Sequence, residues 1–169
     1  MSILTELLAR VKAVESGLQT GEIVRTAVVR HGEEILDLQR LQLFAGKSSS
    51  GEDIRPYYSE DLKPGGYFYS VETAGRYAAW KSSLNYPYNV ERNPDAPNLY
   101  IVGKFHDELG VQFLPDSVAI VGTTPFAKGI IAKYGVNTFG LMPENWNTIF
   151  TYYGAYDEVM QEIKRILYV

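Results

Sequence analysis

One stretch of the sequence, residues 97–134, constrains the fold more than any other. It contains two short apolar runs, Val111–Leu114 and Val118–Val121, which are rich in β-branched and aromatic residues. The tripeptide Pro115-Asp116-Ser117 lies between them. Proline restricts φ in a turn, and Asp or Ser can hydrogen-bond the backbone that follows, so this pattern predicts a β-hairpin.

Helices are predicted on both sides of the hairpin. A short helix over Leu99–Leu109 precedes it, and a helix opened by Pro125 follows it, which gives a helix, a hairpin and a helix over residues 99–135. We therefore expect an α+β fold, in which a small antiparallel sheet packs on helices. At 169 residues, the chain has the length of one domain.

The first 45 residues carry the apolar spacing of two helices, which we expect to form a helical hairpin. Over residues 2–18 apolar side chains recur every three or four positions, and Ser2 can cap that helix. We expect this stripe to pack in the core or in a subunit contact; it consists of Leu4, Leu7, Leu8, Val11, Val14 and Leu18. A second helix is predicted over Glu22–Phe44, with Gly32 as its weak point.

Two long segments lack a regular pattern. Residues 46–69 are rich in Gly, Ser and Pro, and residues 85–98 contain three prolines. Each is either a surface loop or an arm that contacts a neighbouring subunit, and loops this long are uncommon unless they have a function. Tyrosine suits a contact surface, because its ring packs while its hydroxyl finds a polar partner. The candidate subunit-contact residues are Tyr57, Tyr58, Tyr67, Tyr69, Tyr86 and Tyr88. We expect Tyr57 and Tyr58 to lie outside the core.

Further helices are predicted between and after these segments. Residues 70–84 form one, capped by Ser70, with one face made of Ala74, Tyr77, Ala78 and the edge of Lys81. The C-terminal helices occupy residues 143–169; they start at Pro143 and Glu144, and Gly154 breaks them into two pieces.

Composition excludes several classes of function. The net charge is −4 and the basic residues form no run, which disfavours nucleic-acid binding along the chain. Without cysteine, the chain has neither a thiol nucleophile nor a cysteine metal site, and we expect no metal or cofactor. The N-terminus lacks the pattern of a signal peptide and no apolar run is long enough for a membrane span, so we expect synthesis in the cytoplasm and no membrane partner.

Candidate catalytic groups are weak. His106 is followed by Asp107 and Glu108, but consecutive residues on a helix diverge by about 100° and do not converge on one ligand. We expect this segment to be a partly exposed polar helix face. The neighbouring carboxylates of Glu33-Glu34 or Glu60-Asp61 could serve a glycan hydrolase, yet a chain with 20 carboxylates offers many such pairs. We therefore expect an assembly protein rather than an enzyme.

Three segments within residues 41–149 match a known sequence pattern: LQLFAGKSSSGEDIRPYYSEDL, PNLYIVGKFHDELGVQF and AKYGVNTFGLMPENWNTI. Together they resemble small neck proteins of tailed bacteriophages, the head-tail connector or tail-completion class, in the version found in crAss-like phages and Bacteroidetes prophages. The chain departs from the family pattern at Val102, His106, Thr138 and Met142.

The resemblance implies a virion structural protein that forms a homo-oligomeric ring, commonly of twelve copies, between the portal and the tail. Its partners would be the portal and other neck or tail proteins, with DNA passing through the lumen, and it implies no catalytic residues. Two other functions remain open: a small phage-encoded effector or inhibitor that binds a host protein, and a hydrolase that uses one of the carboxylate pairs.

Overall fold

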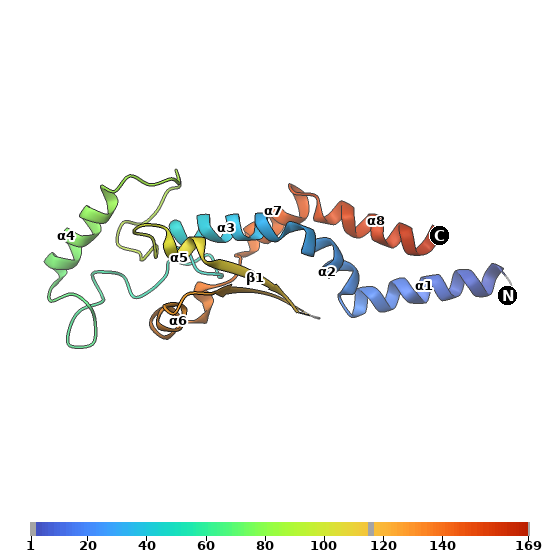
Figure 1. Cartoon of the computed structure of the whole chain (residues 1–169), viewed down its shortest axis with the longest axis horizontal. Coiled ribbons are helices and arrows are strands. Elements are labelled where there is room, and N and C mark those ends of the chain that lie inside the picture. Colours follow the sequence, from blue (N-terminus) through green and yellow to red (C-terminus); the bar gives the residue numbers. More distant parts are fainter. Residues whose placement is uncertain (1–2, 115–116, 169) are drawn as a thin grey trace. The chain divides into compact units, whose positions relative to one another are not determined.

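The computed structural model describes residues 3–114 and 117–168, and its elements are labelled in Figure 1. They are α1 (Ile3–Gln19), α2 (Glu22–Val28), η1 (Val29–His31), α3 (Gly32–Phe44), α4 (Val71–Ser82), α5 (Lys104–Asp107), β1 (Leu109–Phe113), β2 (Val118–Gly122), α6 (Ala127–Tyr134), η2 (Val136–Thr138), α7 (Pro143–Thr151) and α8 (Ala155–Tyr168). Of the described residues, 55% are helical and 9% are extended, and β1 and β2 form a two-stranded antiparallel sheet, which confirms the predicted α+β fold.

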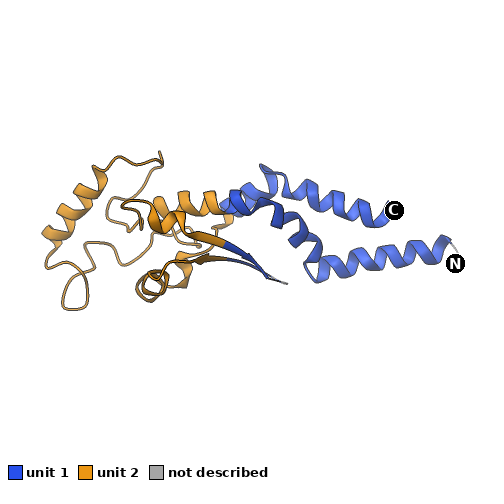
Figure 2. Ribbon diagram, viewed as in Figure 1, with its two compact units in different colours: residues 1–35, 111–119, 144–169 blue, residues 36–110, 120–143 orange. Residues whose placement is uncertain are grey.

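The chain divides into two compact units whose segments alternate along the sequence (Figure 2). Unit 1 comprises residues 1–35, 111–119 and 144–169, and unit 2 comprises residues 36–110 and 120–143. The expectation of one ring-forming domain stays a prediction.

Unit 1 is built mainly from helices. In Figure 1, α1 and α8 run side by side in opposite directions, and α8 also packs against α2. The helices α1 and α2 approach closely at Gly17, where an added Cβ would lie 2.8 Å from Cγ1 of Ile23. Only glycine fits there without a shift, and α1 continues past it to Gln19. Gly21, in the left-handed conformation with φ of 74°, then separates the two helices.

The second predicted helix is interrupted. Residues 22–44 form α2 and α3, with the 3₁₀ turn η1 between them, so the break lies directly before Gly32. Ring atoms of Phe113 would lie 3.6 Å from a Cβ at Gly32. Farther along the chain, the predicted break between the C-terminal helices is confirmed, because α7 ends at Thr151 and Gly154 has φ of 86° before α8 begins.

In unit 2, α4 presents its small residues to an aromatic cluster. Ser70 caps α4 as predicted, since its Oγ accepts a hydrogen bond from the backbone N–H of Thr73 at 3.2 Å. The predicted face is confirmed: Ala74, Ala78 and Lys81 are buried and Tyr77 is half-buried. The buried cluster on this face consists of Tyr58, Phe68, Ala74 and Ala78, with Leu62 and Tyr77 packed against it.

The two long irregular segments of unit 2 are tied to each other. The backbone N–H of Tyr58 donates to the carbonyl of Asp95 at 2.9 Å. The carboxylate of Asp95 accepts from the backbone N–H of Ser59 at 3.0 Å and also from the Ser59 hydroxyl. From the other segment, Nδ2 of Asn93 donates to Asp53 at 2.9 Å. Hydrogen bonds therefore run in both directions between the two segments, from residues 58–59 to Asp95 and from Asn93 to Asp53.

Helix α3 uses two buried glutamines to hold residues 138–142 of unit 2. Gln39 accepts a hydrogen bond from the backbone N–H of Gly140 at 3.0 Å. Gln42 accepts from the N–H of Met142 and donates to the carbonyl of Gly140, both at 2.8 Å. The two side chains thus satisfy backbone groups of the segment that links η2 to α7.

The central stretch differs from its prediction in three places. The helix predicted over Leu99–Leu109 is reduced to α5, because Leu99 has φ of 52° and Gly103 is in the left-handed conformation. The hairpin begins at Leu109, two residues earlier than predicted. The helix after Pro125 begins at Ala127. Pro115 and Asp116 of the predicted turn lie outside the described residues, as does the predicted cap Ser2.

Candidate assembly surface

The outer face of α1 is a continuous apolar stripe. Six large side chains on this helix have exposed fractions between 44% and 88%: Ile3, Leu4, Leu7, Leu8, Val11 and Leu18. Gly17 is the one residue of the described helix that is buried. Of the predicted stripe, Leu4, Leu7, Leu8, Val11 and Leu18 are exposed and Val14 is half-buried, so the expectation that it packs in the core is wrong, while its use in a subunit contact stays a prediction. Contiguous exposed apolar residues of this size mark interaction sites in folded proteins.

Arg10, beside this stripe, makes one hydrogen bond to α8 and one ion pair within α1. Nη1 of Arg10 donates to the carbonyl of Leu167 at 3.1 Å, and Nη2 lies 2.6 Å from the carboxylate of Glu6. The contact with α8 therefore falls on the edge of α1 and leaves the apolar residues open. It orients α1 within unit 1 without covering its stripe.

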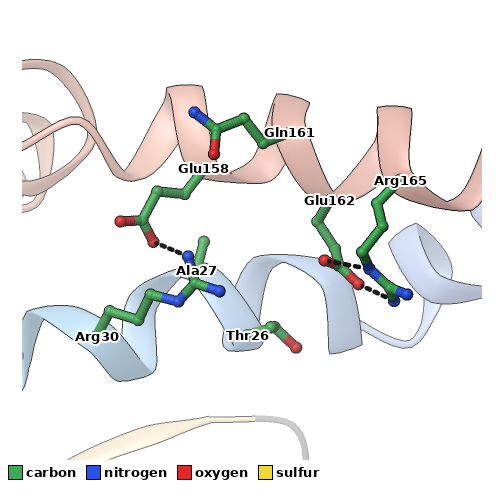
Figure 3. Close-up of a pocket in the computed structure, with 7 residues that line it drawn as sticks. All are labelled: Thr26, Ala27, Arg30, Glu158, Gln161, Glu162 and Arg165. Carbon is green, nitrogen blue, oxygen red and sulfur yellow. Dashed lines mark hydrogen bonds and ion pairs between the residues drawn. The ribbon is translucent and has the colours of Figure 1, made fainter.

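A polar groove of about 280 Å³ lies between α2 and α8 in unit 1 (Figure 3). Its charged lining residues are paired. Arg30 lies 3.5 Å from Glu158, and Arg165 donates to both carboxylate oxygens of Glu162, at 2.9 and 2.6 Å. The hydrogen bonds from Arg165 lower the pKa of Glu162. The Arg30–Glu158 pair crosses the groove, and the Arg165–Glu162 pair lies within α8. Each charged side chain that lines the groove therefore has a partner of opposite charge.

The candidate tyrosines divide between buried and exposed positions. Tyr58 is 5% exposed and belongs to the core of unit 2, so the expectation that it lies outside the core is wrong. A residue far along the chain fixes the backbone at this point, since the N–H of Tyr58 donates to the carbonyl of Asp95. Tyr57 is half-buried, and its hydroxyl donates to Asp53 at 2.9 Å.

The other four candidates follow the same division. Tyr86 and Tyr88 are half-buried against Phe44, with ring centroids 4.7 and 5.1 Å from its ring. Tyr67 and Tyr69 are exposed at 69% and 78%. Of the six candidates, these two present most of their rings to a partner; the role of all six in subunit contacts stays a prediction.

Lys81 and His106 are buried more deeply than the sequence analysis expected. Lys81 is 3% exposed, and burial, followed by the nearby charge of Arg92, lowers its pKa to about 7. Its Nζ donates to the hydroxyl of Tyr58 at 2.9 Å. In the sequence, the only sign that Lys81 is buried was its spacing from Ala74 and Ala78, which places it on the same face of the helix.

His106 is fully buried, so its predicted place on a partly exposed polar face is wrong. Its Nε2 lies 3.1 Å from the carbonyl oxygen of Asn98, to which it donates when the ring is neutral. Burial lowers the pKa of His106 to about 4, against the opposing effect of that hydrogen bond. Within α5, Phe105 is buried with it, while Lys104 and Asp107 at the two ends of the helix are exposed. Leu109, at the start of β1, is also buried.

The two candidate carboxylate pairs differ in their surroundings. Glu60 pairs with Arg55, and Asp61 is buried and pairs with Lys133. Glu33 and Glu34 lie in the first turn of α3. In residues 3–114 and 117–168, no group of three or more His, Asp or Glu residues could hold a metal ion. No helix in the same ranges is long and apolar enough to cross a membrane.

Comparison with known proteins gives no relative: no family model, curated protein or solved structure matches this chain.

Proposed function

We propose that this chain is a structural subunit of the head-tail connector of a tailed bacteriophage. Copies of it would form a ring between the portal and the tail, with twelve copies favoured, and DNA would pass through the lumen. This proposal takes its class of protein from the sequence resemblance over residues 41–149 and its physical support from the surface of the molecule.

The apolar stripe on α1 is the observation that carries the proposal. Six large apolar side chains share one helix face, and each is at least 44% exposed. Burying such a face stabilises an assembly by about 25 cal/mol for each Å² of apolar area removed from water. A subunit that functions in a permanent ring gains this burial from its neighbours, whereas a monomer leaves the face in water.

Charge supports the second part of the proposal. The chain carries a net charge of −4, and its basic residues are scattered. A wall of like charge repels the DNA phosphates, so DNA would slide through without binding. Any DNA contact would be non-specific.

Electron microscopy tests the proposed function at two levels. Purified protein is expected to form closed rings of uniform size, and virions with a tagged copy are expected to carry the tag at the junction of head and tail. A stable complex of one copy with one host protein, without rings, would favour the effector hypothesis instead. Turnover of cell-wall glycans by the purified chain would favour the hydrolase.

A further inference from the structure

The apolar residues of α1 repeat with a period of seven. If Leu4 is assigned to position a of a heptad, Val11 and Leu18 also occupy position a. Leu7 and Val14 then occupy position d. Helices with apolar residues at a and d pack on helices of the same kind, because this 3.5-residue period keeps one seam facing the partner. The exposed face of α1 thus has the pattern of a coiled-coil seam.

Most of this seam is open in the folded chain. Every position a is exposed, from 75% at Leu4 to 44% at Leu18. Leu7, at position d, is 51% exposed, and only Val14 is half-buried. The contact of Arg10 with α8 and the close packing of Gly17 on Ile23 of α2 both lie at one edge of the seam, whereas the a positions are exposed.

The residues that flank the seam specify the direction of the partner helix. Ile3, Arg10 and the buried Gly17 occupy position g, and Leu8 and Glu15 occupy position e. In a parallel, in-register pair, each g residue meets the e residue five positions later on the neighbouring helix. Ile3 would therefore meet a leucine and Arg10 a glutamate of the neighbouring copy. Both pairs match, one by apolar contact and one by opposite charge.

Antiparallel pairing gives poorer matches, since g then faces g and e faces e. In one register Arg10 faces the same arginine of the neighbouring copy. In the next register Leu8 faces Glu15. The flanking residues thus favour the parallel arrangement.

We propose that α1 docks on α1 of a second copy of this chain, parallel and in register, with Arg10 of one copy against Glu15 of the next. The g edge of each helix meets the e edge of the other, so the pair is isologous, and a ring would also use a second, different contact between pairs. This inference rests on the proposed function, because it names the surface through which neighbouring copies pair. A helix of 17 residues is marginal as an isolated coiled coil, so unit 1 must hold α1 in place.

Cysteine cross-linking of the full-length protein tests the arrangement. The chain has no cysteine, so single substitutions give unambiguous products. Leu18→Cys places a thiol at position a, next to its equivalent in a parallel pair, and mild oxidation is expected to give covalent dimers. Ser16→Cys is the matched control, since this exposed residue lies on the opposite side of α1. Cross-linking of both variants to the same extent, or of neither, would overturn the proposal.

A charge exchange tests the flanking contact independently. Glu15→Arg brings two cations together in the parallel pair and is expected to weaken self-association about two- to fivefold at low salt. The double variant Arg10→Glu with Glu15→Arg is expected to recover it. Circular dichroism of each variant checks the fold, because Arg10 also pairs with Glu6 within α1.

The outcomes separate this inference from the proposed function. Rings that persist without Leu18→Cys cross-linking, and without any effect of Glu15→Arg, would overturn the α1 contact and leave the connector proposal standing. A wild-type chain that stays monomeric at every concentration would overturn both.

Discussion

Nζ of Lys81 donates a hydrogen bond to the phenolic oxygen of Tyr58 across 2.9 Å, and both side chains are buried in unit 2. Nζ also lies 5.5 and 5.9 Å from the ring centres of Tyr58 and Tyr77. Burial raises the pKa of Tyr58, which keeps its hydroxyl protonated, and lowers the pKa of Lys81 to about 7. Helix α4 is therefore joined to the segment before it by a pair whose charge changes near neutral pH.

This pair makes stability depend on pH. Between pH 7 and 10.5 the unfolded chain keeps the lysine protonated while the folded chain releases the proton. The free energy of unfolding should therefore rise with pH in this window, by at most about 1.4 kcal/mol per pH unit. Below pH 7 both states bind the proton, and this contribution no longer changes with pH.

Chemical denaturation at several pH values from 7 to 9 measures that slope. The variant Lys81→Met keeps the length of the side chain and removes the titrating group, so its slope should be smaller than that of the wild type. Equal slopes in the two proteins would show that the protonation of Lys81 is not linked to folding.

Substitution of Tyr58 should unfold the chain at much lower denaturant concentration than substitution of an exposed tyrosine. Tyr58→Ala removes a buried ring from the α4 cluster and is expected to cost about 3 to 5 kcal/mol. Tyr69→Ala removes a side chain that is 78% exposed, and a change within about 0.5 kcal/mol is expected. Similar losses for both would contradict the buried position of Tyr58.

Asp95 should control the order of both long segments. Its carboxylate binds the backbone of Ser59, so Asp95→Ala leaves that N–H without its partner. Hydrogen exchange is expected to become faster in residues 53–61 as well as around residue 95. Glu91→Ala, at an exposed position of the same segment, is the control and should leave exchange unchanged. Faster exchange confined to one segment would argue against their mutual support.

Gln42 should be intolerant of an apolar replacement, even though it is buried. Gln42→Leu removes hydrogen bonds to Gly140 and Met142 and leaves buried backbone groups unsatisfied, at a cost of about 1 to 3 kcal/mol. Gln161→Leu, at an exposed position of α8, serves as the control and should change stability little. A thermal melt of the two variants makes the comparison, and a neutral Gln42→Leu would remove its assigned role.

Features of the fold that depend on residues close together in the chain were predicted correctly from the sequence. The cap at Ser70, the buried Ala74 and Ala78 one turn apart, and the break at Gly154 all depend on residues within a few positions of each other. The sequence alone also contained the heptad of α1, since that pattern is local as well.

Contacts between distant residues account for what the sequence analysis missed. His106 is buried because Asn98 accepts its hydrogen bond and the guanidinium of Arg40 binds its carbonyl 66 positions away. Tyr58 is buried because Asp95 holds its backbone. The sequence did not show whether the stripe on α1 is buried or exposed, because apolar periodicity identifies the apolar face but not what covers it.

The mass of the purified chain in solution tests the central claim most directly. Sedimentation velocity over a range of concentrations should show one assembled species at a whole multiple of the 19.0 kDa subunit, with twelve subunits favoured. Leu4→Gln together with Leu8→Gln, which changes only exposed positions, should shift the population toward smaller species without unfolding the subunit. A wild-type chain that sediments as a 19.0 kDa monomer at every concentration would contradict the account.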